Sequence, residues 1–335
     1  METSQFDYSK RTLDRANKGL MDSEYRGVPG VKEFRGEQAG PSDPVLFIGT
    51  HTHGDEPGSG AILPALMSGK VQLERGRVIV AANNLAAARN GKRVIPGGLN
   101  YNRLPADDVL AQAHVNNPSV DIQRMRALAQ AGLLEATHGL DLHTIPHSKI
   151  PGFKLHEKGD PAFANAIGLE TFIADITNNQ FDAENPTGPK TVAFGNYIGG
   201  LHNPIPVAEI EGGGKETPRV RQTVAQGTLS VMAQLGMIDP SRYGLKSREM
   251  EQRLYTVTDW AWAPAGYTMA REFEPYAEVQ EGEPVMIDAT EQGRSPILAP
   301  RRGHLIMPPP FGKPLEGNDD WWYSAPVEVS RQMVL

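Results

Sequence analysis

IGTHTHGDEP, residues 48–57, joins the first expected strand to the first expected helix. The apolar run 45–48, bounded by Pro44 and Gly49, predicts a buried strand. Residues 58–68 are apolar at helical spacing. In open α/β sheets, ligand sites lie at the carboxyl ends of strands, where the chain turns toward a helix. This stretch therefore places histidines and carboxylates where such a site is expected.

Strand and helix signals alternate on either side of this stretch. Further strands are expected at 77–82, 140–143, 170–176 and 207–210. Helices are expected at 58–68, at 120–136, from Asp160 onward, and from a Thr217 cap to about Leu235. This alternation is typical of the α/β class. It predicts a mostly parallel mixed sheet covered by helices.

The domain organisation follows from changes in this pattern along the 335 residues. Residues 1–40 lack clear periodicity and predict an N-terminal lead-in segment, after which the ordered core begins. Residues 41–244 carry the α/β pattern and form the expected catalytic domain. Residues 245–335 contain short apolar runs between Pro, Gly and charged turns, which predicts a smaller β-rich domain. We expect this domain to cover the mouth of the active site.

Composition excludes several classes of protein. A formal net charge of −7, without a basic stripe, argues against a nucleic-acid partner. The N-terminal residues lack the apolar core of a secretory signal, and no window is apolar enough to span a membrane, so we expect a cytoplasmic protein without membrane contact. With 0 cysteines, disulfides and thiol catalysis are excluded. Any bound metal must be held by histidine and carboxylate.

Three residues form a candidate zinc site. His53 and Glu56 are three residues apart, so both can approach one point once the backbone turns into a helix. His143 ends the expected strand 140–143 and can supply a third ligand. Asp141, two residues earlier on the same strand face, can orient a ligand from behind. A catalytic zinc ion needs three protein ligands and one open position.

Each of these signals is weak alone. A His-x-x-Glu pair occurs often by chance at a helix start, and a single histidine at a strand end is more often an ordinary polar residue. Glu211 strengthens the combination, because it ends another expected strand and precedes three glycines, where backbone can approach a ligand closely. An ionised glutamate beside a zinc ion is a suitable general base.

Four motifs in this order resemble the succinylglutamate desuccinylase/aspartoacylase family, a branch of the zinc carboxypeptidase-like enzymes. The motifs are GTHTHGDE at 49–56, LNYNR at 99–103, DLHT at 141–144 and EIEGG at 209–213. Together they cover residues 45 to about 235, and the β-rich tail is similar to the family's C-terminal domain in general character. The resemblance implies a zinc carboxypeptidase-like fold and one zinc ion per chain.

The resemblance also implies a role for each matching residue. His53, Glu56 and His143 match the zinc ligands. Glu211 matches the base that activates water; Glu209 is its competitor, but the family's base is followed directly by glycine, as Glu211 is.

The substrate contacts follow in the same way. Asn102 and Arg103 match the pair that binds the substrate carboxylate, which suits the fork of an arginine side chain. Arg93 matches the arginine that polarises the scissile carbonyl, with Arg89 as its rival.

The chain departs from the family pattern at two places. Insertion of residues 96–98 lengthens the spacing from Arg93 to Arg103, and Asn100-Tyr101 replaces the family's Asp-Leu. The segment 145–159 reads as a loop that matches no family pattern. We expect it to shape the substrate pocket, with His147 and the preceding Thr144 as substrate-binding residues; a solvated loop is the alternative.

These features predict a zinc-dependent hydrolase that cleaves a linear amide, a carbon–nitrogen bond other than a peptide bond, in a small carboxylate-bearing N-acyl compound. Two alternatives stay open, namely a carboxypeptidase on the same scaffold and a non-catalytic binding protein. The acyl group, the amine and a homo-oligomeric state stay open as well. Histidine and carboxylate ligands also suit cobalt, nickel and manganese.

Overall fold

The computed structural model describes most of the chain. The described residues are 6–102, 104–105, 120–145, 152–158, 163, 165–174, 191–192, 206–214, 216–263, 265–290, 292–306, 308–309, 311–315, 319–324 and 328–334. Two predicted site residues, Arg103 and His147, lie outside them. The same applies to most of the helix expected from Asp160.

A mixed sheet forms the centre of the molecule. From one edge its strands are β3 (Val31–Arg35), β5 (Arg77–Ala82), β4 (Val45–Thr50), β7 (His138–Ile145), β11 (Val207–Gly214), β8 (Phe153–Lys158), β9 (Thr171–Ala174) and β12 (Arg248–Ala263). Strands β5, β4, β7 and β11 run parallel to one another, and β8, β9 and β12 run parallel among themselves in the opposite direction. Edge strand β3 is antiparallel to β5. The predicted α/β class with a mostly parallel mixed sheet is confirmed.

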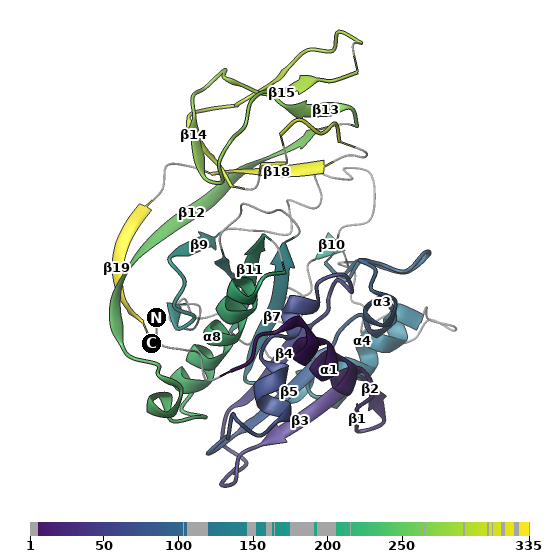
Figure 1. Ribbon diagram of the computed structural model, residues 1–335, viewed down its shortest axis with the longest axis vertical. Helices are drawn as coiled ribbons and strands as arrows, with labels where there is room; N and C mark the ends of the chain where they lie inside the picture. Colours follow the sequence, from purple (N-terminus) through teal and green to yellow (C-terminus); the bar gives the residue numbers. More distant parts are fainter. Residues whose placement is uncertain are drawn as a thin grey trace.

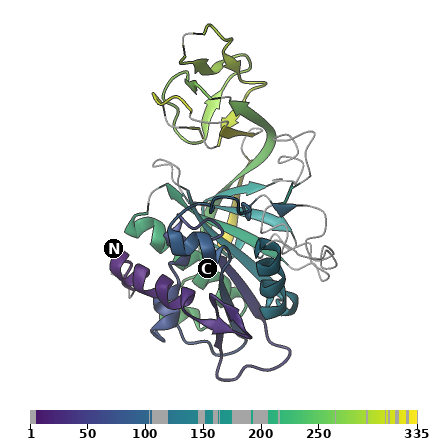
Figure 2. The same cartoon turned by 90° about the vertical axis from the view of Figure 1, so that its right-hand side faces the viewer.

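Helices cover both faces of this sheet. On β4, Leu46 and Ile48 belong to one apolar cluster, and Val45 and Phe47 belong to another, as the alternation of side chains along a strand requires. The first cluster contains residues of α1 (Lys10–Met21), α2 (Leu63–Met67) and α8 (Pro218–Gln234), and the second contains residues of α4 (Val120–Ala131). Figure 2 shows α1, in purple, and α4, in teal-blue, on opposite sides of the sheet.

Side-chain caps explain where the longer helices begin. Thr217 precedes α8 and accepts a hydrogen bond from the backbone N–H of Val220, which confirms the predicted cap. Ser9 caps α1 in the same way. Asn84 caps the short helix α3 (Leu85–Asn90), which ends at Gly91 with a left-handed φ of 59°.

Residues 1–40 are more than a lead-in. Helix α1 and strand β3 lie in this segment, β3 pairs with β5 along its whole length, and Leu20 of α1 is fully buried in the larger apolar cluster. The expectation that the ordered core begins after residue 40 is therefore wrong. Strand β3 has the sequence VKEFR, and its three central residues are only partly buried. Because an edge strand is partly exposed, its sequence shows only a weak alternation of apolar and polar residues.

The expectation of a loop at 145–159 is also partly wrong. Residues Phe153–Lys158 form β8, which lies inside the sheet between β11 and β9. Its sequence, FKLHEK, alternates only briefly between apolar and polar residues, so its local signal for a strand is weak. Its pairing with β11 on one side and β9 on the other depends on residues far away in the chain. The remainder of the expected loop, 146–151 and 159, lies outside the described residues.

A β-rich lobe lies at one end of the molecule, and β12 runs from the central sheet into it (Figure 1). The lobe contains β13 (Tyr267–Met269), β14 (Ala277–Val279), β15 (Pro284–Asp288), β16 (Ile297–Leu298), β17 (Gly303–Leu305) and β18 (Asp319–Ser324), while β19 (Glu328–Val334) returns to pair with the first half of β12. A separate apolar cluster that includes Met269, Val279 and Val285 forms its core. The carboxyl ends of β7 and β11 point toward this lobe in Figure 1.

Smaller elements complete the described chain. They are β1 (Glu24–Tyr25), β2 (Val28–Pro29), β6 (Leu104–Pro105), β10 (Thr191–Val192) and the 3₁₀ helices η1 (Pro57–Gly60), η3 (Leu133–Glu135) and η4 (Pro240–Tyr243). Element η1 follows the candidate site directly. None of the described helices is long and apolar enough to cross a membrane.

The burial of α1 leads to a stability prediction. We expect Leu20→Ala to lower the free energy of unfolding by roughly 2–5 kcal/mol, because a fully buried leucine is lost from the core. Arg15→Ala on the exposed side of the same helix should change it by less than about 0.5 kcal/mol. Urea unfolding of both variants tests this; equal effects would contradict a core role for α1.

Candidate metal centre

The loop after β4 is held by hydrogen bonds between its backbone and one serine side chain. His51, directly after the strand, adopts a left-handed φ of 52°, which is uncommon for a residue other than glycine. Its N–H donates to the Ser59 hydroxyl at 2.9 Å, and that hydroxyl donates to the Glu56 carbonyl at 2.7 Å. Ser59 thus holds both ends of the turn. The turn brings His53 and Glu56 back over the carboxyl end of the sheet.

The three predicted ligands come together. Nδ1 of His53 lies 2.7 Å from Oε1 of Glu56, and Nδ1 of His143 lies 3.1 Å from Oε2 of the same carboxylate. The candidate ligand atoms of all three residues lie within 4.8 Å of one another, and all three residues are buried. The rings of His53 and His143 are 5.2 Å apart. Two segments 87 residues apart in sequence therefore meet at one point.

Electrostatics favours the ligand form of Glu56. Burial alone would raise the pKa of Glu56, but the adjacent His143 and His53 lower it below its ordinary range, so the carboxylate is ionised. Burial lowers the pKa of His53, which favours the neutral imidazole that a metal requires.

His143 differs from His53 in its charged surroundings. Burial alone would lower the pKa of His143. The carboxylates around it outweigh burial and raise this pKa well above its ordinary value; they belong to Asp141, Glu209 and Glu56. A metal ion that binds His143 must therefore displace a proton.

A chain of polar contacts lies behind His143. Nε2 of His143 lies 3.2 Å from Oδ2 of Asp141, as the position of Asp141 on the strand predicts. The Thr52 hydroxyl donates to Asp141 at 2.9 Å and accepts from the Asn83 amide at 2.9 Å. Carboxylates in this position orient a ligating histidine and raise its basicity. Glu209 is also buried. One of its carboxylate oxygens lies within 4.8 Å of candidate ligand atoms of Asp141 and His143, so these three residues form a second group of possible ligands.

The predicted arginine and asparagine residues have different contacts. Arg93, whose side chain is 49% exposed, donates to Oε1 of Glu56 at 3.2 Å. Arg89 donates instead to the Met21 carbonyl of α1. The structure thus brings Arg93 rather than its rival to the cluster. The backbone N–H of Asn102 donates to the Asn100 side chain at 2.9 Å.

Three predicted residues cannot be placed by their side chains. Arg103 and His147 lie outside the described residues, and only the backbone of Glu211 is described. The register pairs Glu211 with His143 across β11 and β7, and Glu209 with Asp141. Glu211 therefore occupies the strand position beside a predicted ligand.

Thr144 has a different environment from the predicted substrate contact. Its N–H donates to Oε2 of Glu56 at 3.0 Å, and its hydroxyl donates to Oε1 of Glu216 at 2.6 Å. Both groups are thus engaged by protein carboxylates.

Two residues at the site were missed by sequence reasoning. Oδ1 of Asn100 lies 3.2 Å from Nε2 of His53, on the side of the ring opposite Glu56. Asn100 is part of the 99–103 motif, which could have indicated a role. Glu216 lies beyond the three glycines and before the Thr217 cap, and its sequence context offers no signal for its contact with Thr144.

The donor set fits zinc. Two imidazoles and one ionised carboxylate are a common ligand set for catalytic zinc, and three protein ligands leave a position open. Both Nδ1 atoms face the same carboxylate, so their lone pairs can converge once a cation replaces the protons between them.

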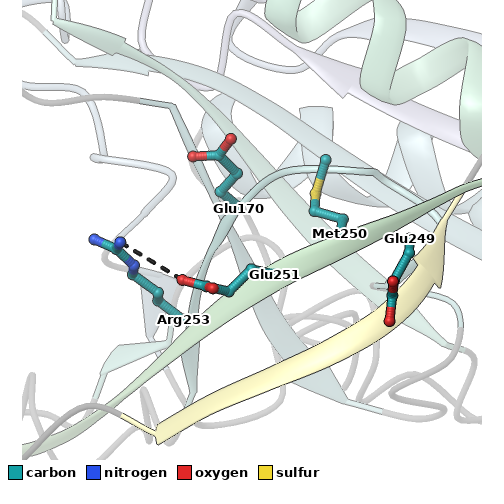
Figure 3. A pocket seen from close by; sticks show the side chains of 5 residues that line it. All are labelled: Glu170, Glu249, Met250, Glu251 and Arg253. Carbon is teal, nitrogen blue, oxygen red and sulfur yellow. Dashed lines mark ion pairs between the residues drawn. The ribbon is translucent and has the colours of Figure 1, made fainter.

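A surface cavity of about 390 Å³ lies elsewhere, along the first half of β12. Figure 3 shows its lining, which consists of Glu170, Glu249, Met250, Glu251 and Arg253. Arg253 and Glu251 form an ion pair at 3.6 Å. The cavity shares no residue with the candidate metal centre.

Comparison with solved structures identifies the class of fold. No protein-family model and no curated protein matches the sequence significantly. Solved structures of succinylglutamate desuccinylase and aspartoacylase proteins, in contrast, superpose over about 90% of the chain. The chain therefore has the aspartoacylase-like fold, as the motifs predict.

Three of these structures illustrate the similarity. A succinylglutamate desuccinylase/aspartoacylase from Rhodobacter sphaeroides is 20% identical, with a TM-score of 0.61 over 90% of this chain and 89% of that one. An aspartoacylase family protein from Mesorhizobium loti is 16% identical, with a TM-score of 0.62 over 88% of each chain. The product-bound ectoine utilization protein EutE from Ruegeria pomeroyi is 16% identical, with a TM-score of 0.60 over 89% of this chain and 88% of that one.

The geometry predicts the metal content of the purified protein. We expect close to one zinc ion per chain, and loss of zinc in His53→Ala and in His143→Ala, because two remaining ligands do not form a tight catalytic site. Elemental analysis after dialysis tests this. His138→Ala, in the same strand as His143 but at its other end, should keep its zinc. Full metal content in both ligand variants would contradict the assignment.

Proposed function

We propose that this protein is a zinc-dependent hydrolase that cleaves the amide bond of a small N-acyl amino acid or a related N-acyl compound. The observation that carries the proposal is the convergence of His53, Glu56 and His143 at the carboxyl ends of β4 and β7. The fold supports it, because the similar solved structures are described as desuccinylases and aspartoacylases. We propose a cytoplasmic location and a boundary near residue 244 between the catalytic α/β domain and the β-rich domain.

The ligand residues would hold the metal through two nitrogens and a carboxylate. Zinc, when bound there, supplies a Lewis acid that lowers the pKa of water and polarises a carbonyl group. Asp141 keeps the imidazole of His143 oriented through Nε2, so that Nδ1 is directed at the shared point. Asn100 performs the corresponding task for His53.

Glu211 is the proposed general base. Its strand position beside His143 supports the assignment. As base it takes a proton from the attacking water, and it then delivers that proton to the amide nitrogen as the carbon–nitrogen bond breaks. The products are a carboxylate and a free amine. An amine is a poor leaving group without this proton, so the same residue serves both steps.

Recognition of the substrate rests on positive charge. Asn102 and Arg103 are proposed to bind the substrate carboxylate, for which the guanidinium fork offers two parallel hydrogen bonds. Arg93 is proposed to stabilise negative charge on the oxygen of the scissile carbonyl. Its contact with Glu56 and its partly exposed side chain support this role, because it lies beside the ligands and can reach a bound molecule. His147 stays a predicted substrate contact.

A substrate screen tests the proposed function. Zinc-loaded protein is incubated with N-acetyl, N-succinyl and N-formyl amino acids, and released amine is measured. A matched series of N-acyl dipeptides and tripeptides separates a deacylase of small compounds from a carboxypeptidase on the same fold. We expect turnover of single-residue substrates and little turnover of peptides, since the β-rich lobe is proposed to cover the site. Preferential peptide cleavage would replace this proposal by the peptidase.

The proposed role of Arg103 can be tested by charge removal. Arg103→Ala should raise KM by roughly 10- to 100-fold, because the substrate carboxylate loses a charge-assisted pair worth about 1.5–3 kcal/mol. Arg103→Lys should recover part of the loss, since it restores the charge without the fork. Steady-state kinetics measures both. If the wild-type enzyme accepts the methyl ester of its substrate equally well, the role is wrong.

The base assignment predicts a separation of binding from turnover. Glu211→Gln should keep zinc and substrate binding yet lose turnover by about 10²- to 10⁴-fold, the range typical of a general base. Glu209→Gln is the matched control on the same strand face and should keep most turnover at saturating zinc. An inactive Glu209→Gln with an active, zinc-loaded Glu211→Gln would move the base two residues back.

A further inference from the structure

Glu216 makes two contacts through a single oxygen atom. Its Oε1 accepts a hydrogen bond from the Thr144 hydroxyl at 2.6 Å and another from the Gly58 backbone N–H at 3.0 Å. The side chain is 32% exposed, yet both of its partners are buried. Glu216 follows β11 and precedes α8, so it approaches the site from a third segment of the chain.

The two partners belong to the two segments that carry the candidate ligands. Thr144 directly follows His143 on β7, and Gly58 is two residues beyond Glu56 at the start of η1. Oε1 of Glu216 therefore connects the segment with His143 to the segment with His53 and Glu56. A second connection runs in parallel, because the Thr144 N–H donates to Oε2 of Glu56 at 3.0 Å.

The surrounding residues are arranged for this carboxylate. Gly58 packs closely against this carboxylate, because a Cβ atom at position 58 would overlap Oε2 of Glu216 unless the glutamate side chain moved. Buried Arg221 also contacts Glu216: its Nη1 donates to the Glu216 carbonyl at 3.2 Å and lies 4.0 Å from Oε2. Nε of Arg221 donates in turn to the Tyr8 carbonyl at 2.8 Å.

We propose that Glu216 is a positioning residue for the metal centre, which sets the distance between the two ligand-bearing segments through Thr144 and Gly58. It contacts Glu56 and His143 through their chain neighbours and does not belong to the ligand group itself. This inference rests on the metal site of the proposed function. It assigns the Thr144 hydroxyl to the ligand geometry rather than to substrate.

Loss of a residue that orients a metal ligand typically lowers metal affinity by about 10- to 100-fold. Glu216→Ala removes the shared acceptor, and Thr144→Val removes one of the donors; both should weaken zinc binding in that range. Glu216→Gln keeps a carbonyl oxygen that can accept both hydrogen bonds, and Thr144→Ser keeps the hydroxyl. Both conservative variants should therefore stay within about threefold of the wild type.

Zinc affinity of the full-length apo protein is measured by competition with a chromogenic chelator. The visible spectrum of the cobalt-substituted protein gives a second readout, because its band positions and intensities depend on ligand geometry. We expect Glu216→Ala and Thr144→Val to alter this spectrum in the same way. Glu251→Ala, an exposed glutamate on β12, is the matched control and should leave affinity and spectrum unchanged.

A double variant shows whether the two residues act through one path. If they do, the loss of zinc affinity in the double variant Glu216→Ala, Thr144→Val should be much smaller than the product of the two single-variant losses. Should Glu216→Ala fail to fold, as judged by urea unfolding of the apo protein, the Thr144→Val and Thr144→Ser pair decides the question.

Unchanged zinc affinity and cobalt spectrum in Glu216→Ala would overturn the positioning role. So would a Glu216→Gln variant as impaired as the alanine variant. The positioning role is distinguishable from the proposed function, because no readout requires turnover. A wild-type protein that binds zinc but cleaves no amide contradicts the proposed function alone, whereas a wild-type protein that binds no metal overturns both.

Discussion

The site depends on one buried carboxylate, that of Glu56. Each of its oxygens makes two contacts: Oε1 with His53 and Arg93, and Oε2 with His143 and the Thr144 N–H. A buried anion is costly unless charges and hydrogen bonds surround it, and here both kinds of partner are present. Because these partners come from separate segments, the fold must bring all of them to one point for the carboxylate to be stable.

The sheet and one turn satisfy that requirement. Strands β4 and β7 are parallel neighbours, so their carboxyl ends lie at the same edge. His51 then adopts a left-handed backbone, and the Ser59 hydroxyl links the segment by accepting from the His51 N–H and donating to the Glu56 carbonyl. A left-handed residue other than glycine stores strain, which persists only where the surroundings fix it. The buried hydrogen bonds of this turn provide that constraint.

Local pattern made much of this arrangement predictable from the sequence. Strand β5 has the bounds that its apolar run predicts. The candidate ligands His53, Glu56 and His143 could be proposed because they lie near a strand end or a helix start and within motifs that resemble those of the aspartoacylase family. The missed elements lack such a local signal. Strand β3 is a partly exposed edge, and β8 has six residues whose place between β11 and β9 depends on distant partners.

The same distinction applies to the side chains around the site. Asp141 could be predicted to support His143, because two residues on one strand share a face. Glu216 could not, because its contacts with Thr144 and Gly58 span 72 and 158 residues and follow no period. Residues that touch a metal must carry ligating atoms, so their chemistry restricts the candidates. Residues that position those ligands need only a hydrogen-bonding atom at the right place, and only the folded chain reveals which residue supplies it.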